Sequence, residues 1–306
     1  MIKVGVSVAE YLGQRTDVAT PNIKPVTEKA QCPFSSGNNC MKTGGKKNPI
    51  CSVRKEDGTY WIVCENRLCT TKKDLPLCPH QQKILLDIAH HIYDPSVTAD
   101  RIAVKREVQL KVSDITDYKA DYVMTIDNGQ SPYPGPDRII LEMQGGGETS
   151  GTEKLTSIVN KWKSHEAPTN SLLSMPSGAS PLETNAWRRQ QEQFIVKGNI
   201  AMQTWKGYGI AFCVGTLLYD YLSRKIDFST LPDLHSYNWT LALIGIKEDV
   251  SNSPVPGPVP LIVDESRLLF TNYQTFVHAL INQGLPSPKA FTGEFITLNN
   301  TSINIP

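Results

Sequence analysis

The chain has 306 residues, with 31 Lys and Arg against 30 Asp and Glu, so its net charge at pH 7 is +1. This balance excludes a polycation that holds nucleic acid or membrane by bulk charge, although positive charge can still gather on one face. Hydrophobic residues at 40% and charged residues at 20% exclude a disordered chain. No apolar run approaches the ~18 residues of a membrane span, and no signal-peptide cleavage motif follows the first residues. We therefore expect a cytoplasmic protein that has no membrane partner.

In the N-terminal part, the pattern predicts a short helix at 8–14, and a Cys-rich segment follows at 32–80. An amphipathic helix is expected at 81–93, because Ile84, Leu85 and Ile88 recur at helical spacing. Three runs rich in β-branched residues, bounded by Asp, Gly or Pro, then predict strands. These runs are 102–112, 121–126 and 138–143.

In the C-terminal part, apolar periodicity predicts helices alternating with strands. The helices are expected at 153–163, 187–205 and 217–225, and the strands at 209–214 and 239–247. Strands first, then helices alternating with strands, indicate an α/β fold with a mixed β-sheet flanked by helices. We divide the chain into an N-terminal segment, 1–80, and a core with its C-terminal extension, 81–306, packed as one compact unit.

Six of the seven cysteines lie in the N-terminal segment, which is the clearest departure from average composition. In a cytoplasmic chain such a cluster favours metal binding over disulfides. The first four are Cys32, Cys40, Cys51 and Cys64. Their spacings of 7, 10 and 12 intervening residues contain no Cys-x-x-Cys pair, so each thiolate would come from a separate loop or strand end. Four thiolates suit tetrahedral zinc or iron. The alternative is a set of reduced cysteines that hold no metal.

Acidic residues lie on two of the predicted middle strands. Asp121 opens one strand, and Glu142 and Gln144 end the next, where the period of two places them on the same face. If the strands are neighbours, Asp121 and Glu142 can hold a hard divalent cation, which would bind a phosphate and activate a water molecule. Glu107, on the preceding strand, is a possible further acid. Taken alone, the same pattern also fits ordinary polar strand ends.

The two patterns together resemble a known family, the NotI-type and EagI-type Type II restriction endonucleases, which have a PD-(D/E)xK nuclease core. The most specific part of the resemblance is Cys32-Pro-Phe, Cys40, Cys51-Ser-Val and Val63-Cys-Glu-Asn-Arg67, with Glu65 where the family usually has Pro. Residues 9–14 look like the family's opening helix, and Leu141-Glu-Met-Gln144 looks like its catalytic strand. Residues 239–249 with the Pro-rich stretch after them resemble its C-terminal strand and connector.

The resemblance implies a set of metal ligands and catalytic residues. Cys32, Cys40, Cys51 and Cys64 would hold a structural metal, which is iron in the family and for which zinc is also chemically reasonable. Asp121, Glu142 and Gln144 would form the catalytic set that holds Mg²⁺, and Glu107 aligns only loosely. Asp127 and Asp137 remain alternatives to Asp121. Many such nucleases carry Lys at the position of Gln144, and Gln cannot supply a positive charge. Cys69 and Cys78 have no family counterpart and are expected to be structural thiols.

The implied activity is Mg²⁺-dependent hydrolysis of phosphodiester bonds in double-stranded DNA, at a G·C-rich palindrome read by a homodimer. A cognate DNA methyltransferase would act on the same site. Donors and acceptors suited to base recognition are Glu148, Thr149, Lys154, Arg188 and Arg189. The arginines could instead contact phosphate or solvent alone. The alternatives for the whole chain are a homing or repair nuclease on the same core, and a metal-stabilised DNA-binding or scaffolding protein that does not cleave.

Overall fold

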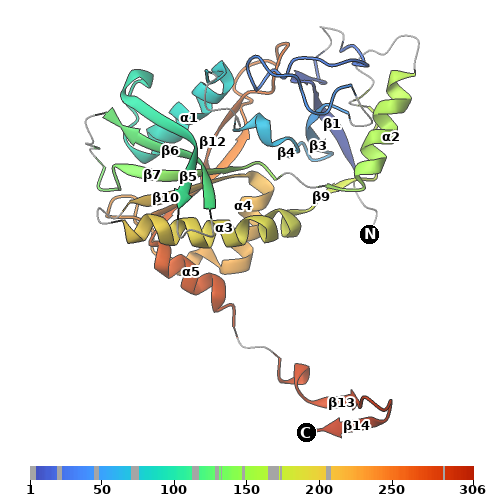
Figure 1. Ribbon diagram of the computed structural model, residues 1–306, viewed down its shortest axis with the longest axis vertical. Coiled ribbons are helices and arrows are strands. Elements are labelled where there is room, and N and C mark those ends of the chain that lie inside the picture. The colour runs from blue at the N-terminus through green and yellow to red at the C-terminus, as the bar shows by residue number, and fades with distance from the viewer. Residues whose placement is uncertain are drawn as a thin grey trace.

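A computed structural model of the chain describes residues 5–18, 23–44, 48–69, 76–111, 117–127, 131, 133–146, 149–164, 172, 174–204, 208–284 and 287–306. Its centre is a six-stranded sheet in the order β12-β11-β10-β7-β6-β5 (Figure 1). The strands are β5 (Ile102–Lys111), β6 (Asp117–Ile126), β7 (Arg138–Gln144), β10 (Gly209–Gly215), β11 (Leu241–Glu248) and β12 (Leu261–Thr271). β7, β10 and β11 run parallel, and the other neighbours are antiparallel. The predicted mixed α/β sheet is confirmed.

Helices cover both faces of this sheet (Figure 1). They are α1 (Pro79–Ile92), α3 (Glu183–Gln203), α4 (Thr216–Ile226) and α5 (Tyr273–Ile281). Successive strand residues belong to two apolar clusters, since side chains alternate along a strand. Ile140 and Phe212 pack with α3, α4 and α5, whereas Leu141 and Cys213 pack with α1. β10 is buried along its whole length, as expected of a parallel strand covered on both faces.

A second, antiparallel sheet in the order β2-β1-β3-β4 is built from the N-terminal segment. Its strands are β1 (Val6–Tyr11), β2 (Gln14–Arg15), β3 (Ile50–Lys55) and β4 (Tyr60–Ile62). Ile62 pairs with Gly146, just beyond the end of β7, and Tyr11 packs edge-on against Trp162 of α2 (Thr152–Lys163). Residues of this sheet and of α3 share one apolar cluster, so the N-terminal segment and the core pack together.

A buried ion pair joins the small sheet to the rest of the molecule. Glu10 of β1 accepts from Arg67 at 2.8 Å, from the Ser52 hydroxyl at 2.7 Å and from the Val259 backbone N–H at 2.7 Å. Arg67 lies in a short 3₁₀ helix, η1 (Glu65–Arg67), and its guanidinium also stacks on Phe34. Burial alone would raise the pKa of Glu10, but the charge of Arg67 and its hydrogen bonds hold that pKa below its usual value.

The helix predicted at 8–14 is wrong, because residues 6–11 form strand β1. Val8 pairs with Val53 of β3, and a turn with positive φ at Leu12 and Gly13 ends the strand. Pairing with β3 and burial against the core outweigh the local preference of this short segment. The structure therefore does not reproduce the opening helix of the resemblance.

The remaining elements are short. They are the two-residue strands β8 (Thr149–Ser150) and β9 (Ser180–Pro181), the 3₁₀ helices η2 (Ala99–Arg101), η5 (Phe228–Thr230) and η6 (Pro288–Ala290), and the hairpin β13 (Gly293–Ile296) and β14 (Ser302–Ile305). The hairpin stands clear of the main body beyond α5 (Figure 1). Phe295 and Ile303 are paired across the hairpin, and both are exposed. None of the helices described is long and apolar enough to cross a membrane.

Candidate active site and cysteine cluster

Three acidic residues predicted from the sequence come together on neighbouring strands. Glu107, Asp121 and Glu142 lie on β5, β6 and β7, which are adjacent in the sheet. The β5–β6 register places Glu107 across from Asp121, and the β6–β7 register, continued by one residue from Tyr122 and Leu141, places Asp121 across from Glu142. The Met143 N–H donates to Asp121 Oδ2 at 2.8 Å. Asp121 and Glu142 are therefore neighbours, as a shared cation site would require.

These acids line a cavity of about 240 Å³ at one end of β7. Its walls are Glu65, Cys69, Glu107, Lys119, Asp121, Glu142, Met143, Gln144, Gln190, Gln193 and Lys197. The alternatives Asp127 and Asp137 do not line it: Asp127 follows the last residue of β6 and Asp137 precedes the first residue of β7. The geometry thus favours Asp121 over both.

Glu142 is a strongly perturbed acid of this cavity. Its side chain is buried, its Oε2 accepts from Lys197 Nζ at 2.7 Å, and its Oε1 has no hydrogen-bond partner among the described residues. Burial and then the charge of Asp121 raise the pKa of Glu142 to about 8, against the lowering effect of Lys197. Burial also raises the pKa of Asp121. Two carboxyl groups that both resist ionisation in one cavity form a site that a cation would stabilise.

Glu107 adopts a backbone conformation that is unusual for its residue type. Its φ is +48°, in the left-handed region, within a strand that otherwise pairs regularly with β6. A non-glycine residue there costs roughly 1 kcal/mol or more and persists only where the surrounding structure holds it. The Glu107 carboxylate lies near Lys119, at 4.0 Å. The strain occurs at the strand position beside Asp121, which supports a functional role for this cavity.

Lys197 is one residue of this site that the sequence argument missed. It comes from α3, far along the chain, and its side chain is almost completely buried against Glu142. The available signal was the spacing of Gln190, Gln193 and Lys197, which puts three polar side chains on one face of an otherwise amphipathic helix. Glu65, which replaces the family's Pro, also lines the cavity and was not predicted.

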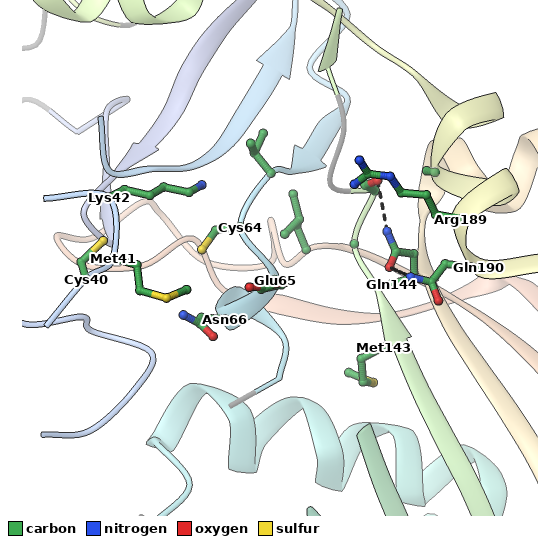
Figure 2. Close-up of a pocket in the computed structure, with 15 residues that line it drawn as sticks. Cys40, Met41, Lys42, Cys64, Glu65, Asn66, Met143, Gln144, Arg189 and Gln190 are labelled. Carbon is green, nitrogen blue, oxygen red and sulfur yellow. Dashed lines mark hydrogen bonds between the residues drawn. The ribbon is translucent and has the colours of Figure 1, made fainter. Parts of the chain in front are cut away.

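Gln144 is held at the rim between two partners. Its Nε2 donates to the Gly146 carbonyl at 3.1 Å, and its Oε1 accepts from Gln190 of α3 at 3.0 Å. Figure 2 shows Gln144 and Gln190 side by side on one wall of a second cavity. The Gln144 side chain is therefore oriented by Gln190 of α3, although an amide cannot contribute a charge.

The second cavity, of about 490 Å³, adjoins the first and shares Glu65, Met143, Gln144 and Gln190 with it. Cys40, Lys42 and Cys64 lie on the opposite wall from Gln144, and Arg189 lies beside Gln144 (Figure 2). The acidic cavity thus shares part of its lining with a larger cavity that has a basic residue on each side.

Of the residues predicted to read bases that the structure describes, three are exposed and one is buried. Arg188 and Arg189 are exposed on α3, and Arg189 borders the larger cavity. Lys154 of α2 donates to the Gly178 carbonyl at 3.4 Å, and Thr149 is buried in the β8–β9 pair, which removes its side chain from the surface. Glu148 lies outside the described residues.

The first four cysteines gather around Phe34 in a small cluster of their own. The group consists of Cys32, Cys40, Cys51 and Cys64. Burial raises the pKa of the Cys32, Cys51 and Cys64 thiols, and neighbouring cysteines add to the rise. The Gly13 N–H donates to Cys51 Sγ at 3.3 Å, and none of the seven cysteines is in a disulfide. Four thiols from separate segments fit the donor chemistry of zinc or iron.

The sulfur atoms of these four cysteines are too far apart to bind one metal ion without moving. No three of the four sulfurs lie within 4.8 Å of one another, so they would have to draw together around a metal ion. Within the described part of the chain, the one set of three possible ligand atoms that meets this spacing is Cys69 Sγ with an oxygen each of Glu107 and Asp121. The four cysteines thus lie together without the spacing of a metal site, and a second set of candidate ligands lies in the acidic cavity.

No protein-family model matches the chain, and the search of curated proteins found no significant match.

Proposed function

We propose that the protein is a Mg²⁺-dependent, site-specific deoxyribonuclease of the Type II restriction class. The observation that carries the proposal is the pairing of Asp121 and Glu142 on adjacent strands. Lys197 donates to one oxygen of Glu142, and the other oxygen has no hydrogen-bond partner among the described residues. Two carboxylates, an amide and a buried lysine around one cavity are the parts that hydrolysis of a phosphodiester requires.

Asp121 and Glu142 would hold the cation, since clustered carboxylate oxygens are the ligands that Mg²⁺ prefers. A bound Mg²⁺ would supply charge stabilisation for the phosphate and would lower the pKa of a water molecule. Glu142 fits this role because its Oε1 is buried without a hydrogen-bond partner in the described structure. Glu107 lies close enough to Asp121 to contribute a further carboxylate.

Lys197 would supply the positive charge that Gln144 lacks. Its ammonium group contacts Glu142 and lines the same cavity, so it orients that carboxylate and lies near any phosphate held there. Gln144 would position water or a phosphate oxygen through its amide, since α3 and the Gly146 carbonyl fix its orientation. The charge would then come from α3 and the hydrogen-bonding group from β7.

Double-stranded DNA would reach the acids through the larger cavity. Lys42 and Arg189 border that space and can contact the phosphate backbone. Arg188 and Lys154 lie on exposed helix surfaces and remain proposed DNA contacts. Recognition of a palindrome, proposed to be G·C-rich, calls for a homodimer, because the symmetry of the protein then matches that of the site.

The cysteine cluster would hold a structural iron or zinc ion beside the DNA path. Cys40 and Cys64 line the same cavity as Arg189 and Gln144, so the shape of this wall depends on how those cysteines are held (Figure 2). A metal bound there would hold the cysteine segments that line this cavity, without taking part in phosphodiester hydrolysis. A methyltransferase that protects the same sequence is the proposed cellular partner.

The test is digestion of unmodified phage DNA by the purified protein with Mg²⁺, in parallel with Glu142→Ala and Asp137→Asn. We expect discrete fragments from the wild type and from Asp137→Asn, whose side chain is exposed outside the cavity. We expect none from Glu142→Ala. Sequencing of the fragment ends would then give the recognition site and the cut position.

Other outcomes separate the alternatives. Discrete cuts that persist in Glu142→Ala would refute the assignment of the site. Cutting confined to branched or damaged DNA would indicate a repair nuclease, and cutting only at a long, rare sequence would indicate a homing nuclease. DNA binding without any cleavage by the wild type would leave a metal-stabilised binding protein.

A further inference from the structure

Cys69 occupies an unexpected position in the acidic cavity. It is buried two residues after the end of η1, and its Sγ lies within 4.8 Å of an oxygen of Glu107 and of an oxygen of Asp121. It lines the same cavity as Glu142 and Lys197. Cys69 is thus separate from the four-cysteine cluster, and a thiol stands among the carboxylates that we assign to Mg²⁺.

A second observation points to a ligand at this place. Glu142 is buried and lines the same cavity, and its Oε1 has no hydrogen-bond partner in the described part of the chain. A buried carboxylate oxygen left without a partner is unfavourable, because nothing replaces the hydrogen bonds that it would make with water. A cation in the cavity would give this oxygen the partner that it lacks.

We propose that Cys69, Glu107 and Asp121 form a binding site for a thiophilic divalent cation such as Zn²⁺ or Cd²⁺, beside the Mg²⁺ position. On binding, the S–H bond of Cys69 breaks and its proton passes to water, while the sulfur donates an electron pair to the cation. The two carboxylates complete a set of one sulfur and two oxygen ligands, and Glu142 Oε1 is the available fourth donor.

The ligand chemistry decides which cation this site prefers. Mg²⁺ accepts oxygen ligands and gains little from sulfur, whereas Zn²⁺ and Cd²⁺ bind thiolate strongly. In a tetrahedral zinc site, sulfur and oxygen ligands lie about 3.6 Å apart, from bond lengths of about 2.3 and 2.1 Å. Ligand atoms within 4.8 Å of one another need only a modest contraction to reach that geometry.

This site would regulate the activity proposed above, and that part of the inference rests on the proposed function. Asp121 belongs both to the thiophilic site and to the Mg²⁺ site, so one carboxylate serves two competing cations. Occupation by Zn²⁺ or Cd²⁺ would therefore weaken Mg²⁺ binding and arrest cleavage. Replacement of Cys69 by Ser would keep the oxygen ligands and remove this sensitivity.

The test is Cd²⁺ binding to the full-length protein, followed by cadmium NMR spectroscopy, which separates a four-sulfur environment from one with a single sulfur and several oxygens. We expect both signals from the wild type. In Cys69→Ser, we expect the mixed signal to disappear and Cd²⁺ affinity at this site to fall roughly tenfold or more. The four-sulfur signal would remain, which shows that the variant is folded.

Cys78→Ser is the matched control, because Cys78 is also buried and lies close in sequence. Cys78 is the N-cap residue of α1, where Ser is a favourable replacement. This variant should keep both signals, and Glu107→Gln should weaken the mixed one. A mixed signal that is absent from the wild type, or that persists in Cys69→Ser, would overturn the inference. Because the readout needs no DNA, it can succeed even if the nuclease proposal fails, and the reverse also holds.

Discussion

Lys197 of α3 donates to Glu142 of β7 at 2.7 Å, and both side chains are buried. Many nucleases that use such paired acids carry Lys two positions after the Glu, and here that position is Gln144. The structure brings a lysine to the same carboxylate from a helix instead. The cavity therefore contains a buried cation although its strand motif lacks one.

The first prediction concerns this lysine. Lys197→Met removes the ammonium group and keeps a similar length of apolar side chain. We expect the cleavage rate to fall by roughly 10²- to 10⁴-fold, because a charge that stabilises the reacting phosphate is lost. DNA affinity should change little, since the contact lies in the cavity and not on the exposed surface. The measurements are single-turnover cleavage and an equilibrium DNA-binding assay.

Two controls accompany this prediction, a test of folding and a second lysine variant. Lys197 lowers the pKa of Glu142, so its removal keeps Glu142 protonated and leaves no unpaired charge. We therefore expect Lys197→Met to remain folded, which thermal unfolding would check. Lys83→Met, at an exposed ion pair with Asp249, should cleave like the wild type. If Lys197→Met retained full activity, Lys197 would be a structural partner of Glu142 only.

The second prediction concerns pH. Because the pKa of Glu142 is raised to about 8, this group holds a proton at neutral pH in the metal-free protein. Mg²⁺ must displace that proton, so Mg²⁺ affinity should rise with pH up to about 8 and each binding event should release protons. Isothermal titration calorimetry in two buffers of different ionisation enthalpy measures the release. Equal heats in both buffers would contradict the prediction.

The same shift fixes the sign of a stability effect. A carboxyl group whose pKa is higher in the folded state binds more protons there than in the unfolded chain. The Glu142 contribution to stability therefore falls as pH rises from its ordinary pKa of 4.5 to about 8. Mg²⁺ should offset this loss, so the increase in melting temperature on adding Mg²⁺ should be larger at pH 8 than at pH 5.5.

The third prediction concerns the buried pair Glu10–Arg67. Arg67→Met leaves the Glu10 carboxylate buried without its charged partner, and we expect a loss of about 3–5 kcal/mol in the free energy of unfolding. The pKa of Glu10 is lowered in the folded protein, so the pair contributes most above pH 4.5 and its contribution fades as pH falls. Urea denaturation at pH 7 and at pH 4 measures both effects.

An exposed ion pair provides the scale for that loss. Lys83–Asp249 has a similar separation of 3.1 Å, but the lysine side chain is more than half exposed. Lys83→Met should therefore cost less than about 1 kcal/mol. Similar losses for Lys83→Met and Arg67→Met would show that burial does not strengthen the Glu10–Arg67 pair.

The sequence predicted those parts of the structure that rest on local patterns. β-branched runs located the central strands, and the period of two placed Glu142 and Gln144 at the end of β7, as observed. The proximity of Asp121 and Glu142 was expected on the condition that their strands are neighbours, and consecutive strands commonly pair. The structure of β1 depends on pairing with β3, which lies far along the chain. For this segment the local pattern wrongly predicted a helix.

The candidate site shows the same limit. Lys197 and Cys69 reach the cavity from α3 and from the chain after η1, so their roles depend on packing that no local spacing encodes. Glu10 and Arg67 lie within segments that carry the resemblance, yet no role could be assigned to them without the buried contact between them. Sequence spacing grouped the four cysteines correctly, but it could not give the distances between their sulfurs.

The fourth prediction concerns the metal of the cysteine cluster. Elemental analysis of the purified protein should find about one equivalent of iron or zinc, as expected for a four-thiolate site. Cys64→Ser should lose that metal and lower the melting temperature, because metal binding to such sites contributes directly to folding. Cys213→Ala, at a cysteine buried within β10 and remote in sequence, should keep the metal. Full metal content in Cys64→Ser would show that Cys64 is not a ligand, and a metal-free wild type would leave the four cysteines as reduced thiols around Phe34.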